Sequence, residues 1–266
     1  MLHNVRNGAL ALLVLIATGC AGVSGPRLDT GADRPVSDTP AANPAQARAK
    51  ISAELGMAYF EIGRFDVALD EAKVALAHDS GYAPAYHLLG LVYMFLEDNG
   101  VARENFNRAL ALAPRDPEIN NSFGWFQCVN GQKQEGLQRL LAAARNPYYR
   151  HPSRAHTNAG LCLVRMGDDT GAAEQFRRAL AFDAGNSQAR FLLAQVEYRQ
   201  GDYLGARQQL VELHQRREPT AETAWLGLRT ERRLGNRDSE ASYAAQLSGR
   251  FGTSPEYKAM MQGLFE

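Results

Sequence analysis

The chain has 266 residues, with 29 basic and 29 acidic side chains and a formal net charge of zero. This balance argues against a nucleic-acid partner, because affinity for nucleic acid rests on a basic surface. The sequence contains no phosphate-binding glycine loop, no Cys-x-x-Cys and no His-Glu-x-x-His. We therefore expect no enzyme, no cofactor, no metal site and no small-molecule substrate.

Residues 1–19 are typical of a secretory signal peptide. Residues 1–7 carry Arg6 and no acidic side chain, and residues 9–17 form an apolar run that is too short to span a bilayer. Residues 17–19 are Ala-Thr-Gly, and small residues directly before a cysteine resemble the bacterial lipobox. We therefore expect residues 1–19 to be removed and Cys20 to carry the lipid. The alternative is an ordinary secreted protein with an incidental cysteine.

The next segment, residues 20–44, is predicted to be a flexible tether. It is rich in proline and glycine and has few large apolar side chains, so it cannot bury enough surface to offset the entropy cost of ordering. Ala21 follows the cysteine, and in lipoproteins similar to those of enteric bacteria this favours the outer membrane. The expected location is therefore the periplasmic face of the outer membrane, with a lipid anchor.

Residues 45–252 carry a regular repeat of small residues. One track of the repeat, with two extra residues before its fourth member, runs through Gly56, Gly90, Gly124, Gly160, Ala194 and Leu228. A parallel track with the same period runs through Ala68, Ala102, Gly136, Ala172 and Ala206. The period is that of tetratricopeptide (TPR) repeats, in which small residues allow two antiparallel helices to approach closely. The prediction is an all-α, right-handed α-solenoid of about six TPR repeats, followed by a short capping helix over residues 253–266.

The first helix of each TPR unit lines an inner groove, so the residues at its groove positions are candidate partner contacts. These residues are Met57, Phe60, His87, Leu91, Met94, Phe95, Asn121 and Trp125. Most are apolar or aromatic, where a purely structural helix would present charged side chains to water. An apolar surface of this kind suits the binding of a helix or strand from another protein. The alternative is that the next repeat covers several of these side chains.

Two further cysteines, Cys128 and Cys162, lie near the ends of the first helices of adjacent repeats. These helices should run side by side, which would bring the two Cα atoms within reach of a disulfide. An oxidising compartment would preserve such a bridge. Two buried free thiols are the alternative.

Residues 120–128, Asn-Asn-Ser-Phe-Gly-Trp-Phe-Gln-Cys, resemble the Asn-Asn-x-x-Gly-Trp-Phe segment of the PilF/PilW type IV pilus biogenesis lipoproteins. Residues 158–162 and 254–257 also match, and the order of lipobox, linker, six repeats and final helix is the same. The resemblance implies a pilotin, an outer-membrane lipoprotein that helps the secretin localise and assemble, with the secretin subunit as its partner. The alternative function is a general envelope adaptor that recruits cell-wall hydrolases or other periplasmic proteins.

Replacement of the lipidation residue tests the anchor. Cys20→Ser removes the only cysteine that follows the apolar run, so the variant should fractionate as soluble periplasmic material instead of membrane material. Cell fractionation followed by immunoblotting measures this, and retention of the variant in the membrane fraction would rule out the lipid anchor.

Overall fold

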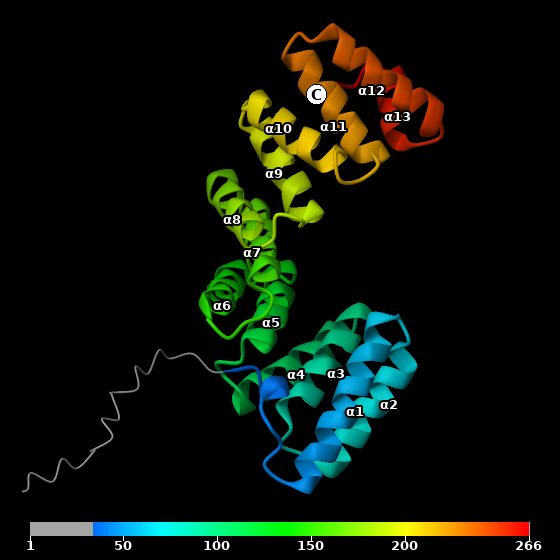
Figure 1. Ribbon diagram of the computed structural model, residues 1–266. Coiled ribbons are helices and arrows are strands. Elements are labelled where there is room, and N and C mark those ends of the chain that lie inside the picture. The colour runs from blue at the N-terminus through cyan, green and yellow to red at the C-terminus, as the bar shows by residue number, and fades with distance from the viewer. Residues whose placement is uncertain (1–33, 266) are drawn as a thin grey trace, which may run out of the picture. The chain divides into compact units, whose positions relative to one another are not determined.

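The computed structural model describes residues 34–265, and this part of the chain is entirely helical (Figure 1). Its elements are η1 (Val36–Asp38), α1 (Pro44–Glu61), α2 (Phe65–His78), α3 (Ala83–Phe95), α4 (Asn99–Leu112), α5 (Pro117–Val129), α6 (Lys133–Arg145), α7 (Pro152–Met166), α8 (Asp169–Phe182), α9 (Ser187–Arg199), α10 (Tyr203–His214), α11 (Ala221–Arg233), α12 (Arg237–Arg250) and α13 (Pro255–Met261). The expected signal peptide, Cys20 and residues 20–33 of the expected tether lie outside the described residues.

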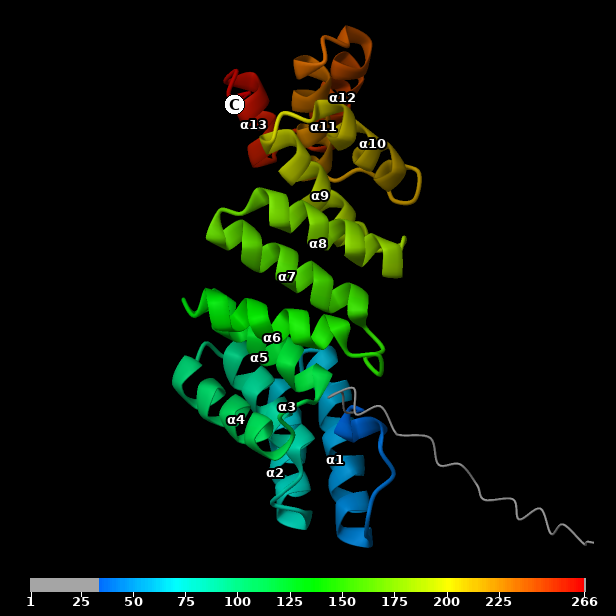
Figure 2. The same ribbon diagram turned by 90° about the vertical axis from the view of Figure 1, so that its left-hand side faces the viewer.

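The first twelve α-helices form six helix–turn–helix units. Each odd-numbered helix from α1 to α11 packs against the even-numbered helix that follows it, and Figure 2 shows α7 and α8 lying side by side as one such pair. The odd-numbered helices also contact one another: α1 contacts α3, α3 contacts α5, α5 contacts α7, and α9 contacts α11. This pattern confirms the prediction of an all-α solenoid of TPR repeats.

Glycines allow the two helices of a unit to approach closely. A Cβ atom added to Gly90 would lie 2.7 Å from the ring of Phe106, and one added to Gly160 would lie 2.5 Å from the ring of Phe176. Both distances are shorter than any normal carbon–carbon contact, so a side chain at either glycine would displace the buried ring or move the helices apart. The aromatic partner follows the glycine at the same interval in both units.

The predicted register is wrong by one residue in the sixth unit. The close contact there involves Gly227, where an added Cβ would lie 2.5 Å from the ring of Tyr243. Leu228, which the regular count selects, is instead buried in a cluster with Leu247. The interval from Ala194 to Gly227 is shorter by one residue than the interval between the earlier glycines. The first residues of α9 and α11 are still 34 positions apart, so the shift comes from the place of the glycine within α11.

The last described residues of the expected tether are packed against the repeats. We call residues 34–43 the N-terminal strap. The Val36 amide donates a hydrogen bond to Asp116 Oδ2 at 2.8 Å, Asp38 forms an ion pair with Arg150 at 2.9 Å, and Val36 packs against two core clusters. The prediction of a flexible tether is therefore wrong for the strap, because Val36 has an apolar site to fill and its amide has a buried acceptor. Helix α1 itself begins at Pro44, with Asn43 as its N-cap.

The capping helix is shorter than predicted. Helix α13 covers Pro255–Met261, and Ser254 caps it by accepting a hydrogen bond from the Tyr257 amide at 3.1 Å. It packs on α11 and α12, and the ring of Phe265 lies 5.6 Å from that of Trp225. The C-terminal segment therefore covers the end of the last repeat, as expected of a cap.

The turn inside each unit needs one residue with positive φ. Glycine supplies it in five units, at Gly63, Gly131, Gly167, Gly201 and Gly235. The second unit has Glu97 at the equivalent place, with a φ of 62°. A side chain in this left-handed region costs roughly 1–2 kcal/mol, because Cβ crowds the following carbonyl oxygen.

The strain at Glu97 can be relieved by mutation. Glu97→Gly should raise the free energy of unfolding by up to about 1 kcal/mol, because the relief exceeds the roughly 0.4–1 kcal/mol of added unfolded-state entropy. Gly201→Ala is the matched control: no atom lies within 4 Å of its added Cβ, so only backbone strain acts, and stability should fall. Urea denaturation measures both changes. A loss of stability in Glu97→Gly would contradict this account.

Candidate partner-binding groove

The eight predicted groove residues come from α1, α3 and α5. Six of them keep contact with solvent in the described structure: Met57, Phe60, Leu91, Met94, Phe95 and Trp125. We call these six the apolar groove residues. Phe95 is 57% exposed, and the other five are half-buried. Side chains of this kind are available to a partner while still being positioned by their own helices.

Three phenylalanine rings meet where the first and second units join. The ring centroids of Phe60 and Phe95 are 5.1 Å apart, and Phe65 lies 5.6 Å from each of them. Such aromatic pairs stabilise their own arrangement, so the cluster is a pre-formed apolar surface. Sequence reasoning missed Phe65 because it considered only the first helix of each unit, whereas Phe65 begins α2.

The other apolar groove residues rest on the core of the neighbouring units. Leu91 and Met94 pack against a buried cluster of phenylalanines from α4 and α5. Trp125 packs against the cluster around the two cysteines of α5 and α7, and the Arg165 guanidinium lies 5.6 Å from the centroid of a Trp125 ring. A cation over an indole face is a favourable contact that also orients the ring. The packed core clusters therefore hold these groove side chains in place.

His87 and Asn121 do not present an open surface to a partner. His87 is 6% exposed and lies beside Phe106, and Asn121 is 4% exposed and accepts a hydrogen bond from Asn158 Nδ2 at 3.1 Å. The physical reason is that neighbouring odd-numbered helices contact each other, so a position that faces the next unit is covered by it. The prediction that Asn121 is a groove contact is therefore corrected by the structure, whereas His87 faces an internal cavity instead of the open groove.

A cavity of about 220 Å³ lies beside His87. It is lined by residues of α1, α3, α5 and α7, by turn residues that include Tyr82, and by Ser37 of the N-terminal strap. Burial, with a smaller contribution from the charge of Arg154, lowers the pKa of His87 to about 4, so its ring is neutral at pH 7. Burial and nearby acids raise the pKa of Tyr82 to about 12, so its hydroxyl stays protonated.

Two carboxylates of α5 and the turn before it line the same cavity. Asp116 is 3% exposed and accepts hydrogen bonds from three backbone amides, including that of Val36. Glu118 accepts a 2.6 Å hydrogen bond from Arg154. Burial nevertheless raises the pKa of both carboxyl groups, and the charge of Asp38 raises both further. The lining of the cavity therefore contains more carboxyl groups than basic groups, and Arg154 is paired with one of them.

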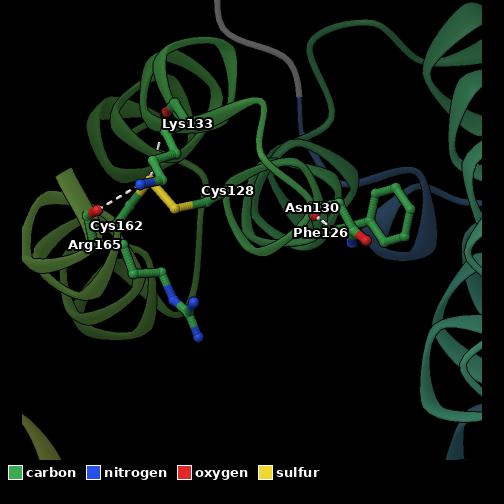
Figure 3. The surroundings of a disulfide bond; sticks show 6 residues. All are labelled: Phe126, Cys128, Asn130, Lys133, Cys162 and Arg165. Carbon is green, nitrogen blue, oxygen red and sulfur yellow. Dashed lines mark hydrogen bonds between the residues drawn. A yellow bond between two sulfur atoms is a disulfide. The ribbon is translucent and has the colours of Figure 1, made fainter.

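A disulfide joins α5 to α7 (Figure 3). Cys128 and Cys162 are separated by 34 positions in the sequence, and their Cα atoms are 5.8 Å apart. Beside the bridge, Lys133 Nζ donates a 2.6 Å hydrogen bond to the Arg165 carbonyl oxygen. The third and fourth units are thus joined covalently and by a polar contact at the end of α7.

The remaining histidines of the middle units, His151 and His156, have different surroundings. His156 is buried, shares a 2.9 Å hydrogen bond with Gln175 and stacks on Phe182, whereas His151 is exposed. Among residues 34–265, no group of three His, Cys, Asp or Glu side chains is arranged to hold a metal ion. The contacts of His156 are those of a structural side chain.

Comparison with known proteins agrees with this architecture. Two tetratricopeptide-repeat family models match the chain, one over residues 83–116 and the other over residues 129–187 and 182–222. The type IV pilus assembly protein PilF of Pseudomonas aeruginosa is 27% identical over 248 residues, which is 93% of this chain and 96% of PilF. The solved structure of Pseudomonas aeruginosa PilF and the crystal structure of PilW, described as a type IV pilus biogenesis factor, are similar to this chain with TM-scores of 0.76 and 0.75. They are 27% and 28% identical to this chain, and each match covers 83% of this chain and all of the other.

Removal of the disulfide should lower stability. The double variant Cys128→Ala/Cys162→Ala loses a cross-link that constrains the unfolded chain, so its free energy of unfolding should fall by about 2–4 kcal/mol. Urea denaturation with and without a reducing agent measures this. The reductant should destabilise the native protein but not the double variant, and equal sensitivity of the two would contradict the bridge.

Proposed function

Because the chain belongs to a PilF/PilW-like family of TPR proteins, we propose that it acts in type IV pilus biogenesis as a non-catalytic, partner-binding protein. The main support for the proposal is the set of apolar groove residues. These side chains stay in contact with solvent, while the opposite faces of their helices are packed in the core. A folded chain keeps such side chains at the surface when a partner covers them.

The finer proposal is that of a pilotin whose partner is a segment of the secretin subunit. An apolar groove between helices accepts an extended or helical segment, and methionine and aromatic side chains adapt to its shape. Burial in the groove would keep an aggregation-prone segment of the subunit covered until the ring assembles. This step requires binding and release only, with no bond made or broken.

Membrane attachment through Cys20 completes the proposed mechanism. None of the helices in residues 34–265 has both the length and the apolar character that a membrane crossing requires. In this proposal, a lipid on Cys20 holds the repeats at the periplasmic face of the outer membrane. Tethering carrier and subunit at one surface raises their effective concentration, which favours multimerisation without any new contact.

Changes in the apolar groove residues should abolish function without unfolding the protein. Met94→Ala and Phe95→Ala remove side chains that are half-buried and 57% exposed, respectively, so each should cost about 1.5 kcal/mol of stability or less. Both variants should lose the secretin multimer and surface pili. Trp125→Ala should do the same, with a larger loss of stability because Trp125 also packs on the core.

Two control variants separate loss of the groove surface from general effects of removing an apolar side chain. Leu204→Ala removes an apolar side chain on α10 that is 65% exposed and lies outside the groove, and assembly should be normal. Phe106→Ala empties a fully buried site and should lower stability by roughly 3–5 kcal/mol. Thermal melting and a secretin multimer gel are run on every variant. Normal multimers in both Met94→Ala and Phe95→Ala would contradict the proposal and favour a general adaptor.

A further inference from the structure

The cavity beside His87 is lined by two buried polar atoms that have no partner. Tyr82 Oη and His87 Nε2 form no hydrogen bond, although their side chains are only 2% and 6% exposed. Both residues line the same 220 Å³ space. Buried polar groups in folded proteins almost always have a partner, so two such atoms at one cavity point to a polar ligand.

The charges around this cavity define the ligand's sign. Four carboxylate side chains line it, Glu54, Glu61, Asp116 and Glu118, against the single guanidinium of Arg154. The carboxylates also act on one another, because the charge of Asp116 contributes to raising the pKa of Glu118. A cation entering the cavity would relieve this repulsion, whereas an anion would increase it.

The volume of the cavity and the hydrogen-bond acceptors that line it favour an organic cation as the ligand. A volume of 220 Å³ is smaller than the roughly 300–1,000 Å³ of typical small-molecule sites, but it can accept one long side chain. Within the described residues, no three of the acidic and histidine side chains are close enough together to hold a metal ion. The neutral His87 ring and the Tyr82 oxygen can each accept a hydrogen bond. Ammonium and guanidinium groups donate hydrogen bonds and accept none, so they suit this lining.

We propose that this cavity receives the cationic end of a lysine or arginine side chain from the bound partner segment, an inference that rests on the proposed partner-binding function. The carboxylates supply the charge, and Tyr82 Oη and His87 Nε2 accept hydrogen bonds from the cation. The side chain's apolar stem passes Met57 and Ile119, which line the same space. Met57 is also an apolar groove residue, so an occupant of the cavity would continue directly into the groove.

Small amino-acid amides test the cavity without the natural partner. The full-length protein, purified in detergent with ¹³C-labelled histidine, is titrated with N-acetyl-lysine methylamide, N-acetyl-arginine methylamide and N-acetyl-norleucine methylamide. The norleucine compound has a similar apolar stem but no charge. The His87 ring resonance should shift saturably with the lysine or the arginine compound and not with the norleucine compound. Equal shifts with norleucine, or no shift with either cation, would overturn the proposal.

Variants of the carboxylates make the test specific. Glu61→Gln keeps the shape of an exposed side chain and removes its charge, and Glu118→Gln does the same at the partner of Arg154. Each should weaken binding of the cation by about tenfold, which corresponds to about 1.4 kcal/mol. Glu104→Gln, on the exposed surface of α4, is the matched control and should leave the affinity unchanged. Unchanged affinity in both Glu61→Gln and Glu118→Gln would overturn the proposal.

The outcome separates this inference from the proposed function. If neither cation binds but Met94→Ala and Phe95→Ala still lose the secretin multimer, the cavity proposal fails and the groove function stands. If a cation binds at His87 while those groove variants assemble the secretin normally, the cavity is a cation site, but the proposed function fails and with it the assignment of the cation to the partner segment.

Discussion

The close approach of two helices at a small residue is the constraint on which the rest of the structure depends. Where Gly90 or Gly160 faces the aromatic ring of the following helix, no atom can be added without displacing the ring or the helix that carries it. Each unit then becomes a flat hairpin whose two outer faces are free to pack on neighbours or to meet a partner. Because α1, α3, α5 and α7 contact one another in turn, the surfaces that they leave uncovered lie next to each other in the first four units.

The fold could be predicted from the sequence because this constraint places a small residue at a regular interval along the chain. Gly56, Gly90 and Gly124 recur without an exception, and the six units follow from them. The count failed at Leu228 because it assumes the same place in every first helix, and Gly227 is the seventh residue of α11, whereas Ala194 is the eighth of α9. The N-terminal strap was missed for a different reason: its docking depends on Asp116 and Arg150, which lie far away in sequence and carry no local signal.

The candidate site was only partly predictable. Groove positions counted along one helix identify Met94 and Phe95 correctly as solvent-contacting side chains, because their exposure is decided within their own unit. His87 is covered by Phe106 of the second helix of its own unit and Asn121 by Asn158 of the next unit, and a count along one helix includes neither. The cavity is harder still, since it combines four helices, their turns and the strap, and its charge emerges only when side chains from all of them are brought together.

The disulfide between α5 and α7 has a consequence for how the array comes apart. In a linear array each unit contacts only its neighbours, so helices can fray from either end and the chain can open at any junction. The junction between the third and fourth units is closed by a covalent bond and cannot separate in this way. When the array frays from its ends, the third and fourth units therefore stay tethered to each other. The array has a fixed centre, and Trp125 of the groove lies against it.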